Sequence, residues 1–307
     1  CPSHLLEPTR SNLVTYSESF SDASWVKSSG TTLTSNYGIA PNGLIQSTLI
    51  QWSVTQQFIF TSIPSQGQEI STIYIKGISG QGIRFGRTNT VASGSLFTFD
   101  GTWQRLETST NNAGTVLFLS TFNAGNATDF EIWGAQLEAG SYATSYIPTS
   151  GSAVTRSAEA ATDAGNASTF NDSEGVLMAE ISALEGASTL IYRFITLSDG
   201  TASNKISIFF NQNGSLTWQL IGGLTVISRA LSVAITNNNK IAIRYNSTSA
   251  ELYVNGILAD TALNGMTFSG LSTLQFRNND GAYNFYGNTK QLQYFDSALN
   301  DSDLETL

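Results

Sequence analysis

Residues 204–220 read NKISIFFNQNGSLTWQL, and this stretch decides the fold of the second half of the chain. Two segments that alternate in polarity, KISIFF and SLTWQL, flank the pair Asn213-Gly214. Side chains of a β-strand point alternately to its two faces, and an Asn-Gly pair tolerates the positive φ angles of a type I′ turn. The stretch therefore predicts an antiparallel β-hairpin.

The same pattern continues on both sides of this hairpin. ELYV and ILAD flank Asn255-Gly256, while Asp199-Gly200 and Asp280-Gly281 mark two further turns. Only the last residues, SALNDSDLETL at 297–307, carry the caps and first-turn acids of a helix. The second half is therefore expected to be an antiparallel sandwich that ends in one helical turn.

Short segments of period two also dominate the first half of the chain. They are separated by Gly, Asn or Ser and lie at 51–60, 69–76, 104–107, 116–122 and 127–137. Trp52 shares a strand face with apolar residues, so we expect it in the core. Strands of this length and spacing are typical of a β-sandwich or jelly roll rather than a parallel α/β sheet.

A chain of 307 residues fits two domains, at about 100–200 residues per domain. Residues 156–172 are small and polar with almost no aromatic anchor, which is typical of a linker. We therefore expect a first domain at 1–155, a linker at 156–172 and a second domain at 173–307. Because the chain begins with Cys1 and not Met, we also expect it to be part of a longer protein.

Composition excludes several classes of function. The formal net charge is −9, whereas binding to a phosphate backbone requires clustered Lys and Arg, so no nucleic-acid partner is expected. The sequence contains no run of 18 apolar residues, the length that a membrane-spanning helix needs, so no membrane insertion is expected. With one His and one Cys, the chain offers only His4 for a Ser-His-Asp triad and too few ligands for a zinc site, so neither centre is expected.

Carboxylate chemistry is the catalytic option that composition leaves, because glycoside hydrolysis uses two facing Asp or Glu residues. The sequence shows no such pair. Glu180 and Glu185 are five residues apart, which places them on opposite faces of a continuous strand. We therefore assign no catalytic residue and expect the protein not to be an enzyme.

Two segments of the first half resemble the start and end of a domain found in bacteriophage tail-fibre and other virion proteins. They are CPSHLLEPTRSNLVTYSESFSDASWVK at 1–27 and FEIWGAQLEAGSYATSYIPTSGSAVTRSAE at 130–159. The resemblance implies a jelly roll like that of carbohydrate-binding modules. The second half is similar to laminin-G and concanavalin A-like lectin domains through ELYVNG at 251–256 and YGNTKQLQYFDSALNDSDLETL at 286–307. The expected fold class is thus all-β, with two tandem antiparallel β-sandwiches.

The loop at 277–288 is the predicted glycan-binding site. Sugar recognition combines aromatic faces for the apolar side of the ring with planar amide or carboxylate groups for the hydroxyls. This loop holds both kinds of group at high density: Arg277, Asn278, Asn279, Asp280, Tyr283, Asn284 and Tyr286. The alternative is a polar hairpin whose aromatic side chains face the core.

A calcium site is a further hypothesis, although no cofactor is required. Asp199 and Asn204 lie in a turn between two strong strands, where lectin-like sandwiches often bind ligands. Calcium takes 6–8 oxygen ligands. More distant residues such as Asp260 and Asp280 would therefore have to converge on the same place.

The sequence as a whole predicts a component of a phage virion fibre or tail that binds host cell-surface glycans without cleaving them. Its expected partners are bacterial surface polysaccharide and other virion proteins, its location is the virion, and a homotrimer is the favoured oligomer. Several copies on one particle would strengthen weak sites by avidity. Two alternatives stay open: a structural decoration or adaptor protein without glycan binding, and a polysaccharide depolymerase.

Overall fold

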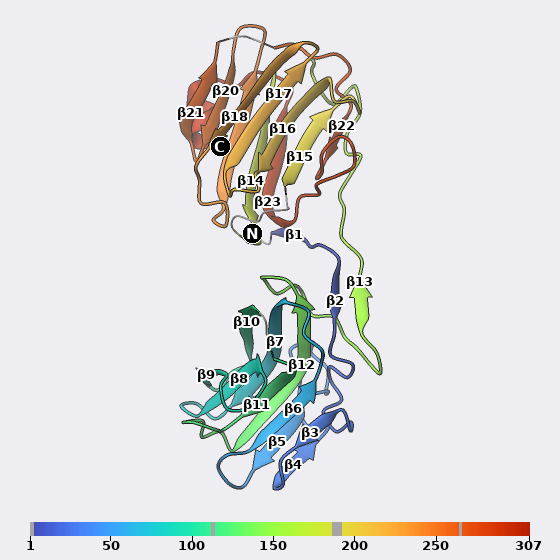
Figure 1. The fold of residues 1–307 in the computed structure, drawn as a ribbon. Coiled ribbons are helices and arrows are strands. Elements are labelled where there is room, and N and C mark those ends of the chain that lie inside the picture. Colours follow the sequence, from blue (N-terminus) through green and yellow to red (C-terminus); the bar gives the residue numbers. More distant parts are fainter. Residues whose placement is uncertain (1–2, 112–113, 186–191, 264–265) are drawn as a thin grey trace. The chain divides into compact units, whose positions relative to one another are not determined.

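The computed structural model describes residues 3–111, 114–185, 192–263 and 266–307. The chain folds into two compact units (Figure 1). We call Thr9–Ser157 the N-terminal sandwich, and Cys1–Pro8 together with Ala158–Leu307 the C-terminal sandwich. Both units consist of antiparallel sheets, which confirms the predicted all-β fold class with two antiparallel sandwiches.

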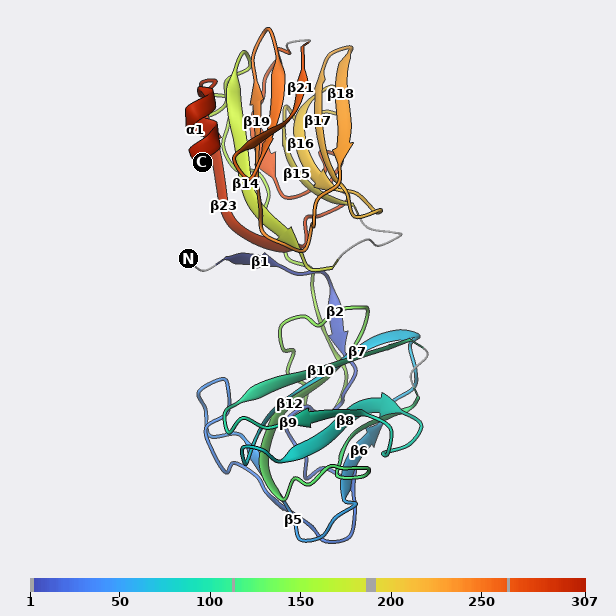
Figure 2. The ribbon, with the colours of Figure 1, turned by 90° about the vertical axis from the view of Figure 1, so that its left-hand side faces the viewer.

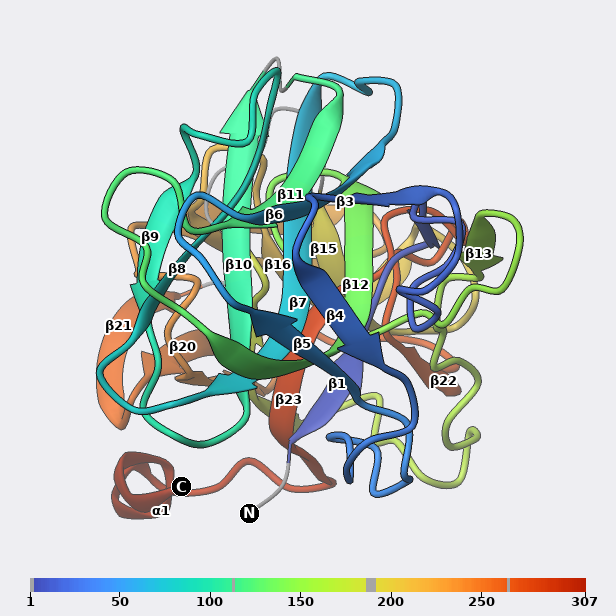
Figure 3. The ribbon, with the colours of Figure 1, turned by 90° about the horizontal axis from the view of Figure 1, so that it is seen from below.

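The N-terminal sandwich contains two five-stranded sheets and one two-stranded ribbon. The first sheet has the order β10 (Gln104–Asn111), β7 (Gln68–Gly77), β12 (Asp129–Ala139), β5 (Thr48–Trp52) and β4 (Thr31–Thr34). The second has the order β3 (Trp25–Lys27), β6 (Phe58–Ser62), β11 (Val116–Ser120), β8 (Gly82–Thr88) and β9 (Ser95–Thr98). The ribbon joins β2 (Arg10–Asn12) to β13 (Val154–Arg156). Figure 3 shows β10, β7 and β12 side by side.

Alternating apolar residues of both sheets form the core of the N-terminal sandwich. Ile50, Ile75 and Ile132 are fully buried there, and Trp52 is 3% exposed, as its position in the sequence predicted. Burying such side chains contributes about 1.5–3 kcal/mol each relative to leaving them in water. One ion pair is also fully buried: Glu69 on β7 and Arg87 on β8.

The C-terminal sandwich contains a six-stranded and a five-stranded sheet. The six-stranded sheet has the order β1 (His4–Leu6), β23 (Gly287–Phe295), β14 (Gly175–Ala183), β19 (Asn239–Tyr245), β20 (Ala250–Val254) and β21 (Ile257–Ala262). The five-stranded sheet has the order β18 (Thr225–Leu231), β17 (Leu216–Gly222), β16 (Asn204–Phe210), β15 (Arg193–Ser198) and β22 (Thr273–Gln275). Side chains such as Leu177, Ile208 and Trp218 form the core.

The predicted hairpins of the second half are present. Strands β16 and β17 pair around Asn213-Gly214, with Phe210 opposite Leu216. Strands β20 and β21 pair around Asn255 and Gly256, whose φ angles of 54° and 77° are both positive, as a type I′ turn requires. Between β16 and β17, by contrast, the connection spans residues 211–215 and only Gly214 of the pair has a positive φ, 78°, so the predicted type I′ turn is wrong there. The Asn-Gly pairs thus located both connections, but they gave the turn type only at Asn255-Gly256.

The predicted terminal helical turn is α1 (Asp301–Thr306), capped by the Asn300 side chain. Figure 2 shows α1 beside the six-stranded sheet. Leu304 of α1 is 1% exposed and packs with Val176, Met178 and Tyr253 on the sheet face that points away from the sandwich core. Within the described residues, no helix has the length and apolarity that crossing a membrane requires.

The boundaries of the two units differ from the predicted domain boundaries. The first domain was expected to start at residue 1, but β1 pairs with β23, with His4 opposite Thr289, and so extends the sheet of the C-terminal sandwich. The segment predicted as a linker at 156–172 belongs to the same sandwich from Ala158 onward. Ala164 exchanges two backbone hydrogen bonds with Leu274, and Phe170 lies in the core. Cys1 lies outside the described residues.

Candidate functional site

The candidate site lies on the outer face of the five-stranded sheet in the C-terminal sandwich. Along β16, Ile206, Ile208 and Phe210 point into the core, so Lys205 and Phe209 belong to the opposite face. The strand register places Phe209 opposite Phe194 of β15, and Lys205 opposite Ser198. The lysine and the two phenylalanines therefore share one face of two neighbouring strands.

The predicted loop is bound to this face by backbone and side-chain hydrogen bonds. The Phe194 N–H donates to the carbonyl oxygen of Tyr283 at 3.2 Å. The Lys205 Nζ donates to the Oδ1 atoms of Asn278 and Asn279, each at 3.2 Å. Phe285 lies 1% exposed in the core and anchors the loop from below.

An aromatic cluster borders the loop and reaches the surface at Tyr283. The Phe194 and Phe209 rings stack with centroids 4.1 Å apart, and the Tyr283 ring lies 5.2 Å from Tyr192 and 6.1 Å from Phe194. Tyr283 is 47% exposed. Its φ of 54° is in the left-handed region, where a non-glycine residue stays only if its surroundings hold it. The cluster thus presents one partly exposed aromatic ring in a fixed position.

The structure brings the other predicted residues into the same loop with defined partners. Arg277 Nε donates to Gln275 Oε1 at 3.0 Å, and Asp280 Oδ1 accepts the Ala282 N–H at 2.9 Å. Asn284 Nδ2 donates to the Tyr286 hydroxyl at 2.9 Å. Asn284 and Tyr286 thus bond to each other, whereas Asn278 and Asn279 bond to the sheet. The ligand-binding role of all seven residues stays a prediction.

Sequence reasoning missed Lys205 and the two phenylalanines of the sheet. The signal was present in KISIFF, where Lys205 and Phe209 alternate with the core residues Ile206 and Ile208. Their face could be read from this alternation. That the loop at 277–286 lies next to this face required the tertiary structure, because more than 70 residues separate the two segments.

Lys205 occupies an unusual electrostatic environment. It is 7% exposed, and burial lowers the pKa of its ammonium group, although the negative charge of Asp280 acts in the opposite direction. Its Nζ lies 6.0 Å from the centroid of the Phe194 ring. Lys205 lies opposite Ser198, four residues before Phe209, which is opposite Phe194. The side chain of Lys205 therefore runs along the sheet toward the aromatic cluster.

Buried hydroxyl groups form the surface under this lysine. Thr196 and Ser207 are opposite each other, fully buried, and their side-chain oxygens lie 3.2 Å apart. Small polar side chains leave room for the Lys205 stem and the loop above them. The outer face of the sheet is thus polar at the centre and aromatic at the Phe194 end.

The predicted calcium residues form a hydrogen-bonded turn. Asn204 Nδ2 donates to Asp199 Oδ2 at 3.1 Å, and the Thr201 backbone and hydroxyl donate to Asp199 Oδ1. Asp260 is instead paired with Arg229 at 2.8 Å. In the part of the chain that the structure describes, no three His, Cys, Asp or Glu residues form a metal-binding group. Calcium binding by Asp199 and Asn204 stays a prediction.

The carboxylates considered for catalysis are engaged in ion pairs. Glu180 lies 3.1 Å from Lys290, and Glu185 lies 3.2 Å from Arg193. Each carboxylate thus faces a basic side chain of its own rather than a second carboxylate. The residues weighed for hydrolysis therefore do not form an acid pair of the glycosidase kind.

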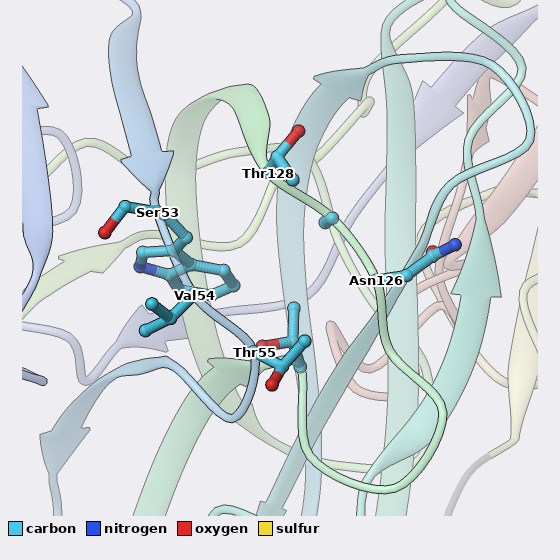
Figure 4. A pocket seen from close by; sticks show the side chains of 8 residues that line it. Ser53, Val54, Thr55, Asn126 and Thr128 are labelled. Carbon is cyan, nitrogen blue, oxygen red and sulfur yellow. The ribbon is translucent and has the colours of Figure 1, made fainter.

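The N-terminal sandwich has cavities of its own. One of about 150 Å³ lies beside Trp52 and is lined by the turn Ser53, Val54 and Thr55 together with Asn126 and Thr128 (Figure 4). The Trp52 ring is buried and its Nε1 donates to Thr31 Oγ1 at 3.0 Å. A cavity of this size holds a few waters or one small group, and its tryptophan offers no exposed face for a sugar ring.

Comparison with known proteins supports the lectin-like class of the second half. Residues 180–305 match the model of the concanavalin A-like lectin/glucanases superfamily. This match agrees with the predicted similarity of the second half to concanavalin A-like domains. No curated protein sequence matches the chain significantly.

Several solved structures are similar at low sequence identity. The CBM40 of the Ruminococcus gnavus IT-sialidase is 15% identical, with 48% of this chain and 95% of that chain covered and a TM-score of 0.39. The SAP-like pentraxin of Limulus polyphemus is 14% identical, with coverages of 43% and 68% and a TM-score of 0.33. Domains LG4-5 of the mouse laminin alpha1 chain are 9% identical, with coverages of 91% and 94% and a TM-score of 0.33. Because these scores are below 0.5, the fold rests on the strand pairing of this chain itself.

Proposed function

We propose that this protein binds carbohydrate without cleaving it, through the loop at 277–286 and the sheet face beside it. The observation that carries the proposal is the position of Tyr283, 47% exposed and fixed against Tyr192 and Phe194, within a loop that also holds amide groups. An exposed ring can pack against the apolar side of a sugar, while Asn279 and Arg277 are placed to bond hydroxyls. The similarity to lectin-like domains supports the same class of ligand.

We further propose that the protein is part of a virion appendage of a bacteriophage and attaches to host surface glycans. This setting rests on the resemblance of residues 130–159 to phage tail-fibre proteins. A shallow site of this kind binds weakly alone. Several copies in one particle, such as a homotrimer, would raise the overall strength of attachment through effective concentration.

A glycan array probed with the full chain and with Tyr283→Ala tests the binding site. Loss of one stacking ring is expected to weaken binding by about tenfold, since such a contact contributes about 1–1.5 kcal/mol. Tyr37→Ala is the matched control, because Tyr37 is 53% exposed but belongs to the N-terminal sandwich. Circular dichroism establishes that both variants are folded.

Three outcomes contradict this proposal. If Tyr37→Ala loses binding and Tyr283→Ala retains it, the glycan binds to the N-terminal sandwich. If no glycan binds to the chain or to the intact particle, the protein is a structural component. If new reducing ends appear when the chain is incubated with host polysaccharide, it is a depolymerase.

A further inference from the structure

Lys205 is a buried cation without a buried anion. Its ammonium group contacts the neutral amide oxygens of Asn278 and Asn279 and the face of Phe194, while the residue as a whole is 7% exposed. Among the described residues, no carboxylate forms an ion pair with it. Burial of a charge is costly unless the charge is paired, so this arrangement favours binding of an anion from outside.

The ammonium group also has unused capacity for hydrogen bonding. A lysine has three N–H donors, and amide oxygens accept two of them here. No acceptor for the third donor is present in the described part of the chain. A bound carboxylate would supply the missing acceptor and place a negative charge in direct contact with the ammonium group, which the exposed Asp280 does not.

The loop around Lys205 is locally positive although the whole chain is acidic. Lys205 and Arg277 contribute two positive charges, and Asp280 contributes one negative charge, whereas the chain has a net charge of −9. The Arg277 guanidinium is held in the same loop by Gln275. A net positive charge at this place favours the approach of anions, in contrast to the net charge of the chain.

We propose that the glycan bound here is an acidic one, whose carboxylate binds Lys205 Nζ while its ring packs on Tyr283. The proposal rests on the proposed function and names the ligand class of the same site. Lys205 Nζ and the Tyr283 ring lie 6.0 Å and 6.1 Å from the centroid of the same Phe194 ring, so the proposal requires a sugar that spans the two side chains beside that ring. Uronic acids and sialic acids share this chemistry, a carboxylate on a pyranose ring.

Binding of the full chain to sugar acids and their methyl esters tests the proposal. The probes are the methyl glycosides of glucuronic acid and N-acetylneuraminic acid, each compared with its own methyl ester in ligand-observed NMR titrations. The ester keeps the ring and removes the charge. At least one acid is expected to bind ten times more tightly than its ester, and a preference for one of the two identifies the source of the carboxylate.

Lys205→Met should abolish this preference, and Lys290→Met should leave it unchanged. Methionine retains the apolar stem of Lys205, and Lys290 is a 40% exposed lysine of the same sandwich that is paired with Glu180. Lys205→Met also leaves the amide oxygens of Asn278 and Asn279 without their donor. Circular dichroism and binding of neutral glycans on the array therefore have to match those of the parent before the titration is compared.

Equal binding of acid and ester overturns the acidic-glycan inference but leaves the proposed function intact. Equal losses in Lys205→Met and Lys290→Met also overturn it, because the effect would then come from overall charge. If neither acid binds while neutral glycans bind on the array, the inference of an acidic ligand is wrong and the proposed glycan-binding site is retained. If nothing binds on the array either, the proposed function fails as well.

Discussion

Glu69 and Arg87 form a buried ion pair in the N-terminal sandwich. Both side chains are 0% exposed, and Arg87 Nε lies 2.6 Å from Glu69 Oε2. Arg87 also donates to the carbonyl oxygens of Ile63 and Pro64, and Glu69 accepts the Gln66 N–H. The pair therefore ties the segment before β7 to strand β8, and each partner depends on the other.

Glu69→Gln should lower the free energy of unfolding by about 3–5 kcal/mol, because it leaves the Arg87 charge buried without a counter-ion. Urea denaturation measures this loss. Glu107→Gln is the matched control: Glu107 is 50% exposed and 3.8 Å from Arg105, so its loss should cost less than about 1 kcal/mol. Similar losses of unfolding free energy in the two variants would show that the buried ion pair stabilises the protein no more than the exposed one.

At the scale of elements, α1 shows how packing stabilises a helix too short to form alone. Its six residues are fewer than an isolated helix needs in water. The Asn300 side chain caps it, Leu304 is buried against the six-stranded sheet, and Arg244 bonds to Asp301 at 2.7 Å and to the Leu299 carbonyl oxygen at 2.7 Å. Contacts on the outer face of the sheet therefore stabilise a helix whose position the local cap and first-turn acids already predicted.

Leu304→Ala should cost about 2–5 kcal/mol, the usual range for removing a buried leucine side chain. The loss should appear in thermal or urea unfolding, together with faster amide hydrogen exchange within α1. Leu224→Ala is the control, because Leu224 is fully exposed and touches no core. If Leu304→Ala were as stable as the parent, α1 would not be docked in solution.

At the scale of the whole molecule, each sandwich contains a tyrosine whose pKa is raised: the partly buried Tyr146 and the buried Tyr245. Burial is the largest cause that raises the pKa of Tyr146 in the N-terminal sandwich, and the nearby Glu18 carboxylate adds to it. Burial also raises the pKa of Tyr245 in the C-terminal sandwich, where its hydroxyl lies 2.8 Å from that of Tyr294. Both halves of the molecule therefore depend on pH in the same sense.

Stability should be constant up to about pH 10 with respect to these groups and then fall. Above that pH the unfolded tyrosines ionise at their ordinary pKa while the folded ones do not, so each lowers the unfolding free energy by about 1.4 kcal/mol per pH unit. Urea unfolding at pH 8 and pH 11, with absorbance at 295 nm, measures both effects. Tyr146→Phe and Tyr245→Phe should each reduce the slope, and Tyr37→Phe, at an exposed position, should not.

The hairpin positions and the terminal helix followed from local patterns in the second half of the chain. The alternation in KISIFF and the pair Asn255-Gly256 depend only on neighbouring residues, so they could be read directly. The boundaries of the two units could not be read from neighbouring residues. Pairing of β1 with β23 joins residues nearly 300 positions apart, and the polar segment from Ala158 onward is held by backbone hydrogen bonds that its side chains do not signal.

The sequence by itself determined the all-β class and a loop at 277–288 rich in amides and aromatic rings. These properties depend on residue types and short-range periodicity. Only the tertiary structure decided that Tyr283 is exposed while Phe285 is buried, and that the loop lies against Lys205. Pairing of distant strands sets both results, because burial and electrostatic environment arise from neighbours in space and not along the chain.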